Sequence, residues 1–504
     1  MAIDGVGSRS SYIGTSILNL KSQLDDLNQQ LATGKISDTY AGQGVNRGLA
    51  VGLRAQISAF DAYADTSTNI NTRINVANLS LQGLVDLATQ VKTAANGSSI
   101  SLSSNGQTSG QVSAQSAFAN AIELLNTRSG DRYLFSGRAT DTPPTATADE
   151  ILYGSADGTR AGLTQVIAER KTADLGASGM GRLNISGAGV SPITLAEDAD
   201  PSVFGLKLSA VSSTLTGATV SGPTGSPPGI SIDLNGTVPN EGDKITVTFN
   251  LPDGTNETVS LTATTKSPPQ PGEFSIGADA ATTSDNLQAA LQTGVKTLAN
   301  TSLVAASAVT ASNSFFGSPP MRVDTSSLPL DSATGLVAGT STDTISWYTG
   351  EVAQGPTDSA RGTAVGRIDQ SITVQYGARA NEDAFRAELQ NIAVYAAVTT
   401  SATDPYANGQ ITALSQRVAL NSSPQQGAQT IQDIQADFAG AQTAMKAASD
   451  RQAQVKTMTQ TMLDSIEGVS QEETATKILA LQTSLSASYQ TTAMLYQLSL
   501  AKFL

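Results

Sequence analysis

The stretch IGTSILNLKSQLDDLNQQL, residues 13–31, carries apolar side chains at alternating spacings of four and three: Ile13, Ile17, Leu20, Leu24, Leu27 and Leu31. Such a heptad pattern predicts a helix with one apolar seam, and that seam needs a partner helix. Ser10 or Ser11 can cap the start of this helix, and Gly34 suits the residue just past its end. The stretch therefore predicts an N-terminal coiled-coil helix.

The end of the chain repeats the pattern. One seam is formed by Ile431, Ile434, Phe438, Ala441 and Met445, within a helical run expected to continue from the break at 404–409 to Ile466. After Gly468, Ser470 and Glu473 form a capping box for a last helix. That helix carries a further stripe: Ile478, Leu481, Leu485, Tyr489, Thr492, Leu495 and Leu498. The N- and C-terminal seams are each other's simplest partners, so we expect both termini at one end of a helical rod.

The longest seam lies between these two regions. Its positions are Leu49, Leu53, Gln56, Phe60, Tyr63, Ser67, Ile70, Ile74, Ala77, Leu81, Leu84, Ala88, Val91 and Ala95. A helix over these positions would be roughly 70 Å long at about 1.5 Å per residue. That length is typical of a bundle or a filament and seldom needed in a globular enzyme core.

Residues 183–351 have a different character, rich in Ser, Thr, Gly and Pro. Apolar residues alternate over 245–251 and again over 259–263, on either side of Asp253-Gly254, which predicts a β-hairpin. A helix is expected over Ser284–Asn300. A second hairpin is expected over 363–376.

These patterns predict a mainly α fold. Its core is a long antiparallel coiled-coil or helical-bundle rod formed by the N- and C-terminal segments, with an inserted outer α+β domain. We expect a terminal coiled-coil domain of residues 1–46 plus 469–504. We also expect a helical rod domain with a β-hairpin, residues 47–182 plus 352–468, and an outer domain of residues 183–351.

Histidine and cysteine are both absent from the 504-residue chain. Disulfides, thiolate nucleophiles and zinc–sulfur sites are therefore excluded, as is any Ser–His–Asp triad. We expect no enzyme, no cofactor and no metal site. The formal net charge of −14 argues against nucleic acid and anionic membrane as partners. No run approaches ~18 apolar residues and the first residues lack a basic and an apolar segment, so we expect neither membrane insertion nor a cleaved signal.

Two blocks resemble a known family. LNQQLATGKISDTYAGQG, residues 27–44, resembles the start of bacterial flagellins and their junction relatives, and residues 476–504 resemble the matching terminal helix. The resemblance covers roughly the first 145 and the last 150 residues. It implies a subunit that is exported to the outside of the cell and self-assembles into the motility filament. The implied partners are other copies of the chain, the hook-associated and cap proteins and an export chaperone.

A third block bears on the choice between two family members. RYLFSGRATDTPP, residues 132–144, resembles a segment of the hook–filament junction protein through Tyr133, Leu134, Phe135, Ser136, Gly137, Thr142, Pro143 and Pro144. The length of the chain and its large insert favour a flagellin instead. Both interpretations stay open, and the filament subunit is preferred because of the length of the chain.

The residues expected to form the assembly seam are Ile13, Ile17, Leu20, Leu24, Leu27, Leu31, Ile478, Leu481, Leu485, Leu495 and Leu498. An alternative from another class is a secreted adhesin whose outer domain carries the function, although that domain clusters no aromatic residues. A zinc peptidase grafted into the insert is excluded, because its H-E-x-x-H motif needs histidine.

Overall fold

The computed structural model describes residues 4–97, 100–187, 189, 191–199, 201–355, 357–423 and 425–501, with side chains described between residues 11 and 497. These residues form mainly α-helices together with several small sheets, which agrees with the predicted fold class at this level. The chain divides into two compact units. The first is Met1–Asn71, Gly366–Val374 and Ala441–Leu504, and the second is Thr72–Val365 and Gln375–Gly440.

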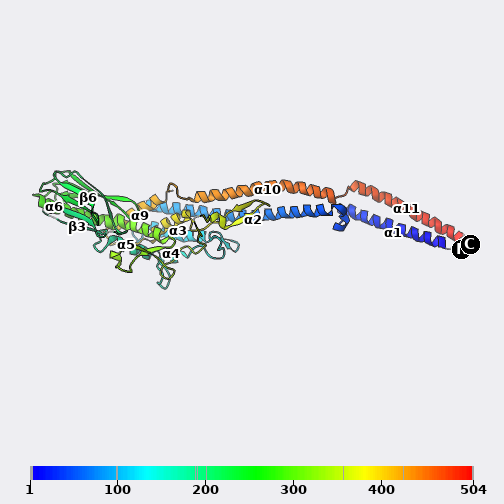
Figure 1. Ribbon diagram of the computed structural model, residues 1–504, viewed down its shortest axis with the longest axis horizontal. Helices are drawn as coiled ribbons and strands as arrows, with labels where there is room; N and C mark the ends of the chain where they lie inside the picture. Colours follow the sequence, from blue (N-terminus) through cyan, green and yellow to red (C-terminus); the bar gives the residue numbers. More distant parts are fainter. Residues whose placement is uncertain are drawn as a thin grey trace. The chain divides into compact units, whose positions relative to one another are not determined.

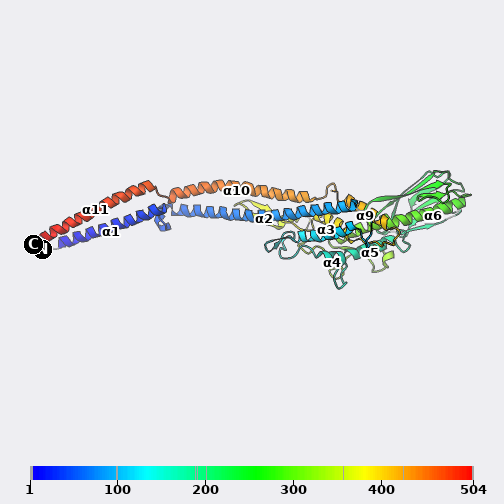
Figure 2. The ribbon, with the colours of Figure 1, turned by 180° about the vertical axis from the view of Figure 1, so that it is seen from behind.

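In the first unit, α1 (Asp4–Thr33) and α11 (Gln471–Ala501) lie side by side and run antiparallel (Figures 1 and 2). The start of α1 and the end of α11 therefore lie at the same end of the pair. Gly34 follows α1 with φ of 72°, the left-handed conformation expected of a residue just past a helix end. The predicted start at Ser10 or Ser11 is wrong, because α1 already begins at Asp4.

Two long helices contribute residues to both units, α2 (Arg47–Gly97) and α10 (Ile431–Glu467), and a short 3-10 helix, η1 (Tyr40–Asn46), precedes α2. The later positions of the predicted α2 seam are all buried: Ile70, Ile74, Ala77, Leu81, Leu84, Ala88, Val91 and Ala95. The start of the seam differs from the prediction. Leu49 is 52% exposed and Ala50 is fully buried instead, because Ala50 packs with Leu53 and Leu463.

Phe118, Phe385 and Tyr395 are fully buried in the second unit. Further helices of the described chain belong wholly to this unit. They are α3 (Ser109–Leu125), α4 (Ala148–Tyr153), α5 (Leu163–Leu175), α6 (Ala280–Leu298), η2 (Ala299–Leu303), α7 (Val304–Phe315), η3 (Leu330–Ser332), η4 (Ala360–Thr363), α8 (Asp383–Ala397) and α9 (Ala407–Asn421).

The helical run predicted to continue to Ile466 is interrupted. It ends with α9 at Asn421 and resumes with α10 at Ile431. Gly427 between them has φ of 82°, which no helical residue adopts. The Thr430 hydroxyl then accepts a hydrogen bond from the Asp433 N–H at 3.2 Å and caps the new helix.

Two four-stranded sheets and α6 share one apolar core in the second unit. One sheet has the order β3-β4-β7-β6 and the other has the order β10-β9-β8-β5. Their strands are β3 (Leu183–Ser186), β4 (Ile193–Glu197), β5 (Lys207–Ser213), β6 (Thr219–Thr224), β7 (Gly229–Asp233), β8 (Lys244–Asn250), β9 (Asn256–Thr264) and β10 (Glu273–Ser275). The first predicted hairpin is confirmed as β8–β9, with Val247 opposite Val259.

Three two-stranded sheets complete the fold. They pair β1 (Arg128–Ser129) with β2 (Arg132–Tyr133), β11 (Met321–Val323) with β12 (Leu336–Ala338), and β13 (Val365–Arg367) with β14 (Thr373–Gln375). The last pair is the second predicted hairpin. Trp347 is buried, and its indole N–H donates to the Phe316 carbonyl at 3.0 Å.

Candidate assembly surfaces and the buried motif

The predicted seam on α1 is half-buried along its length. All six of its positions fall in this class: Ile13, Ile17, Leu20, Leu24, Leu27 and Leu31. Their spacing places them on one face of α1, and the helix beside α1 in this unit is α11 (Figure 1). The structure therefore gives the N-terminal seam a helix neighbour within the same chain.

The predicted positions on α11 are covered unevenly. Ile478 is 7% exposed, and Leu481 and Leu485 are half-buried. Leu495 is 48% exposed. Leu498 belongs to α11, but its side chain lies outside the described ones. Pairing with α1 thus leaves Leu495, near the end of the predicted stripe, open to solvent.

A second group of large apolar residues on the two terminal helices is more than half exposed, and we call it the outer apolar set. Its members are Tyr12, Leu18, Leu479, Tyr489, Met494 and Tyr496, which are between 52% and 79% exposed. Tyr489 belongs to the predicted C-terminal stripe, whereas the other five lie outside every predicted seam. The sequence did carry a signal for them, because α11 places apolar residues on several faces rather than in one stripe.

The outer apolar set has an energetic consequence. Fully burying one large apolar side chain contributes about 1.5–3 kcal/mol before the cost of ordering it. A helix that is apolar on all sides is ordinarily covered on all sides. Because α11 has apolar residues on several faces, it suits packing against further apolar helices in addition to α1.

The segment that follows α1 and the segment that precedes α11 are hydrogen-bonded to each other. The Ile36 N–H donates to the Glu467 carbonyl at 2.7 Å, and the Val469 N–H donates to the Gly34 carbonyl at 3.0 Å. The Glu467 carboxylate, 5% exposed, pairs with Arg54 of α2 at 2.5 Å. These bonds hold the end of α10 against the segment after α1 and against the start of α2.

The junction-like motif lies in the second unit, and its centre is buried. Phe135 is fully buried and meets Phe385 of α8 edge-on, with ring centroids 5.6 Å apart. The Phe135 carbonyl accepts from the Ala380 N–H at 2.8 Å. Gly137 has φ of 66°, and a Cβ there would meet Glu351 Oε2 at 2.6 Å, so this position admits no side chain without rearrangement.

The other motif residues are held through their polar and backbone atoms. The Ser136 hydroxyl donates to the Thr142 carbonyl at 2.8 Å, and the Tyr133 N–H donates to the Thr140 carbonyl at 2.8 Å. Leu134 is half-buried, whereas Thr142 and Pro143 are exposed. The Pro144 carbonyl accepts from the Thr349 N–H at 2.9 Å.

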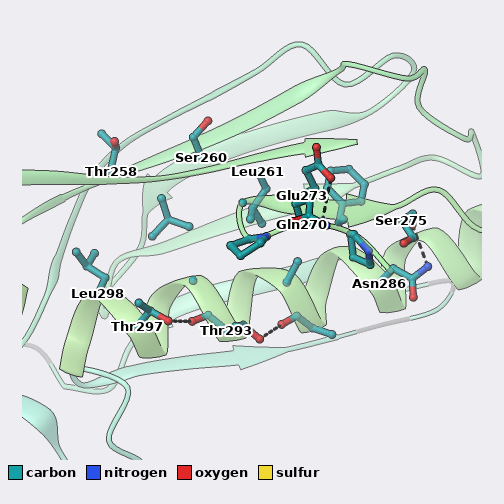
Figure 3. Close-up of a pocket in the computed structure, with 18 of the residues that line it drawn as sticks. Thr258, Ser260, Leu261, Gln270, Glu273, Ser275, Asn286, Thr293, Thr297 and Leu298 are labelled. Carbon is teal, nitrogen blue, oxygen red and sulfur yellow. Dashed lines mark hydrogen bonds between the residues drawn. The ribbon is translucent and has the colours of Figure 1, made fainter. Parts of the chain in front are cut away.

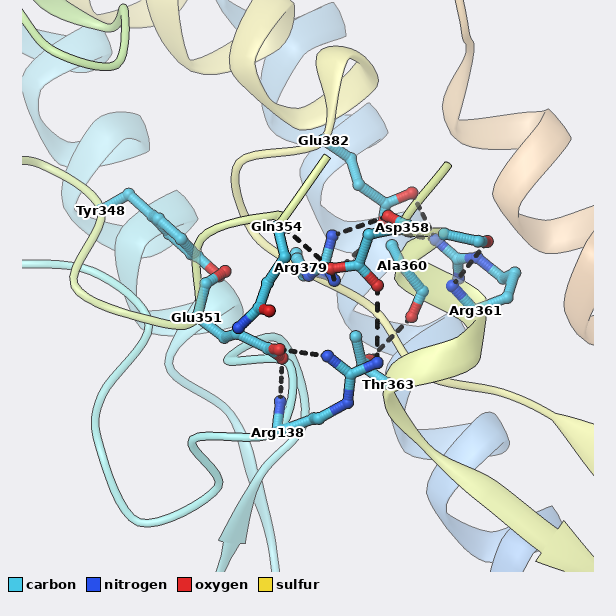
Figure 4. A network of polar contacts seen from close by, with 11 residues as sticks. Arg138, Tyr348, Glu351, Gln354, Asp358, Ala360, Arg361, Thr363, Arg379 and Glu382 are labelled. Atoms are coloured by element: carbon cyan, nitrogen blue, oxygen red, sulfur yellow. Dashed lines mark hydrogen bonds and ion pairs between the residues drawn. The ribbon is translucent and has the colours of Figure 1, made fainter. Parts of the chain in front are cut away.

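A polar network joins this motif to the segment before α8 (Figure 4). Arg138 pairs with Glu351, and it approaches Asp358 at 3.4 Å. Asp358 also accepts from Arg379 Nη2 at 2.6 Å, and Arg379 has a side chain only 4% exposed. The Gln354 N–H and the Arg379 guanidinium together hold the pKa of Asp358 below its usual value.

A second ion pair extends the network. Arg361 pairs with Glu382, and Glu382 Oε1 also accepts from the Arg379 N–H at 3.0 Å. The guanidinium of Arg361 stacks over the Phe438 ring at 5.0 Å from the ring centroid. Sequence reasoning named the motif and missed this network.

In the described part of the chain, no group of three or more Asp and Glu residues is arranged to hold a metal ion. None of the described helices is long and apolar enough to cross a membrane.

No protein-family model matches the chain, and no curated protein matches it.

Proposed function

We propose that this chain is a structural subunit of the bacterial flagellum, of the flagellin type. In this proposal the chain is exported and self-assembles through its terminal helices into the filament used for motility. It catalyses no reaction and needs no cofactor. Its sequence blocks at residues 27–44 and 476–504, which resemble those of flagellins, suggest the family.

The observation that carries the proposal is the outer apolar set on α1 and α11. Six large apolar side chains on one pair of helices are more than half exposed, and each gains about 1.5–3 kcal/mol when it is fully buried. They become favourable when other copies cover them. A subunit of a polymer needs apolar side chains that other copies can cover, whereas an adhesin that acts as a separate molecule does not.

The proposed mechanism uses two layers of apolar contact. The seam of Ile13, Leu20 and Leu27 pairs α1 with α11 as an antiparallel coiled coil, the inner part of the proposed rod. The outer apolar set then packs against the terminal helices of neighbouring copies. Terminal helices without such neighbours gain little from burial and are marginal in water, so assembly and ordering of α1 and α11 are coupled.

The hook–filament junction protein of the same family is the second candidate. The observation that favours it is the RYLFSGRATDTPP segment, which resembles the corresponding segment of that protein, with Phe135 and Gly137 buried at its centre. A junction protein would use the same terminal helices, but it would form a short ring in place of a long filament.

The proposal implies where the chain acts and with what. The location is extracellular, on the bacterial flagellum, and the main partners are identical subunits. Hook-associated and cap proteins and an export chaperone are further partners of the proposed subunit. No nucleic acid and no membrane insertion enter the mechanism.

Seeded polymerisation of the purified chain tests the proposal. Sheared assemblies would be added as seeds to monomer, and the product would be followed by sedimentation and negative-stain electron microscopy. Long filaments are the expected result and would assign the flagellin role. Short rings that form only on hook ends would assign the junction role, and a chain that stays monomeric with seeds and with hook ends would contradict both.

A further inference from the structure

A cavity of about 320 Å³ lies between α2, α8 and the segment that leads into α10, all within the second unit. Glu388 of α8 and Lys92 of α2 are the two charged residues among the described ones that line it. Its walls also carry the apolar side chains of Val85, Ala88 and Ile431. The volume is near the lower end of the range for ligand pockets, about 300–1,000 Å³, so the cavity suits a small molecule.

A larger groove of the second unit lacks such a pair of charges. It has a volume of about 680 Å³ and lies between β9 and α6 (Figure 3). One wall is the part of β9 before Thr262, which has no described strand on the side away from β8. Glu273 is the one charged residue among the described ones that line the groove, and it already bonds to Lys266 at 3.4 Å and to the Gln270 N–H at 3.0 Å. This groove therefore presents no unpaired charge to a ligand.

The carboxyl group of Glu388 has no hydrogen-bond or ion-pair partner in the part of the chain that the structure describes. Burial raises its pKa to about 7, and the charge of Lys92 only partly offsets this effect. Burial without a partner disfavours the charged form of a carboxyl group, and a cation placed beside it favours that form. Glu388 therefore suits an ammonium group of a ligand.

The ammonium group of Lys92 is weakly held within the described chain. Its Nζ donates to the Ser423 hydroxyl at 3.4 Å, which is long for a hydrogen bond. No ion pair joins Lys92 to Glu388 in the described structure, although both side chains line the same cavity. The cavity therefore presents two opposite charges that are not paired with each other.

Hydrogen bonds between the surrounding elements hold the walls of the cavity in place. Gln429 Nε2 donates to Glu382 at 3.1 Å, and Gln429 Oε1 accepts from the Ala384 N–H at 3.5 Å. These bonds join the segment before α10 to the start of α8. Asn391 Nδ2 donates to the Val418 carbonyl at 2.9 Å and joins α8 to α9. Walls that are fixed before a ligand binds lower the cost of ordering on binding.

The two charges select the class of ligand. A ligand that carries only an ammonium group is repelled by Lys92, and a ligand that carries only a carboxylate is repelled by Glu388. A zwitterion meets both charges favourably. Because apolar side chains line the rest of the cavity, an apolar group on the same ligand is also accommodated.

We propose that this cavity binds a small zwitterion, an α-amino acid with an apolar side chain, whose ammonium group pairs with Glu388 and whose carboxylate pairs with Lys92. The apolar side chain of the amino acid packs against Val85, Ala88 and Ile431. This proposal is independent of the flagellar one, because it needs only the folded second unit.

Isothermal titration calorimetry of the full chain with L-leucine tests the proposal. We expect saturable binding at pH 8 with a Kd below about 1 mM. Isoamylamine lacks the carboxylate and 4-methylpentanoate lacks the ammonium group, so each should bind more weakly by at least about tenfold. Leucine binding should also weaken about tenfold at pH 6, because a carboxyl group with a pKa of about 7 is then mostly protonated.

Two protein variants locate the binding. Glu388→Gln and Lys92→Met each remove one charge from the cavity and should each weaken leucine binding by at least about tenfold. Glu388→Gln should also remove the difference between pH 6 and pH 8. The matched controls are Glu123→Gln on α3 and Lys296→Met on α6, because both positions are exposed and neither lines the cavity. Both controls should bind leucine as the wild type does.

Three results would overturn the proposal. The first is the absence of saturable leucine binding by the folded wild type. The second is equal binding of leucine and isoamylamine, which would assign the cavity to an ammonium group alone. The third is leucine binding that Glu388→Gln and Lys92→Met leave unchanged, which would place the ligand elsewhere on the chain.

Discussion

The Phe135 ring packs the junction-like motif into the core, because it is fully buried against Phe385. We expect Phe135→Ala to destabilise the second unit by about 3–5 kcal/mol, the range for deleting a buried aromatic ring. Urea unfolding followed by Trp347 fluorescence measures this, since Trp347 is the single tryptophan and is 2% exposed. Val112→Ala, at a position 44% exposed, should change the unfolding free energy little. Equal losses of unfolding free energy in Phe135→Ala and Val112→Ala would contradict the placement of Phe135 in the core.

Arg379 links two acidic groups of the polar network, Asp358 and Glu382. The pKa of Asp358 is lowered in the folded state, so its contribution to stability is present above the ordinary pKa of 3.8 and is lost as the pH falls below it. Arg379→Met leaves Asp358 charged without its main cationic partner. We expect this variant to lower the melting temperature clearly at pH 7 and less at pH 3, below the ordinary pKa of 3.8. A decrease of equal size at both pH values would mean that Arg379 acts through packing alone.

Glycine has opposite roles at two positions in and beside α1. Gly34 has φ of 72°, whereas Gly14 lies inside the helix with open space where a Cβ would stand. Gly34→Ala should destabilise the helix end by about 1–2 kcal/mol, and Gly14→Ala should stabilise α1 by about 0.5–1 kcal/mol. Hydrogen exchange of the α1 amides measures both changes in helix stability. An increase in protection with Gly34→Ala would contradict the observed conformation.

Glu388 of α8 lies beside a cavity of about 320 Å³ between α2, α8 and the segment that leads to α10. Burial raises its pKa to about 7, and Lys92 only partly offsets this effect. The folded pKa is above the ordinary value of 4.5. The neutral carboxyl therefore contributes to the stability of the folded state, and this contribution is fully present below about pH 4.5. This contribution is lost as the pH rises through 7.

We therefore expect Glu388→Gln to raise the stability of the second unit at pH 8 by on the order of 1–3 kcal/mol, and to change it little at pH 4.5. Thermal unfolding at a series of pH values measures this. Glu123→Gln, at an exposed position of α3, is the matched control and should not alter the pH profile. An unchanged profile for Glu388→Gln would show that the carboxyl is better solvated than its surroundings indicate.

The long helices could be predicted from the sequence because their apolar repeat is sustained. The seam from Ile70 to Ala95 is buried at each predicted position. The break before α10 was missed because apolar spacing continues on both sides of it, although Pro424, Gly427 and Thr430 mark it in the sequence. Most strands outside the β8–β9 hairpin were missed as well, since short Ser- and Thr-rich strands such as β6 give little alternation.

The candidate sites could likewise be predicted only where their residues lie close together in the sequence. The α1 seam was visible because its residues are neighbours along one helix. The polar network was not, because Arg138 and Asp358 are 220 positions apart and only the fold brings them together. The β9 edge could not be predicted either, since strand order decides which backbone groups remain unpaired.

At the scale of the whole molecule, the chain presents two kinds of surface. The terminal helices expose the outer apolar set, which suits identical helices of other copies. The part of β9 before Thr262 has no described strand on the side away from β8.

The measurement that tests the central claim most directly is seeded sedimentation of Leu479→Asp. Leu479 belongs to the outer apolar set and is 65% exposed, so a carboxylate there costs the free chain little but would be buried in an assembly. Leu479→Met keeps the apolar contact, and Gln292→Asp adds the same charge on α6. We predict that Leu479→Asp stays in the supernatant while Leu479→Met and Gln292→Asp sediment as the wild type does. Sedimentation of Leu479→Asp to the wild-type extent would contradict the claim that these helix faces drive assembly.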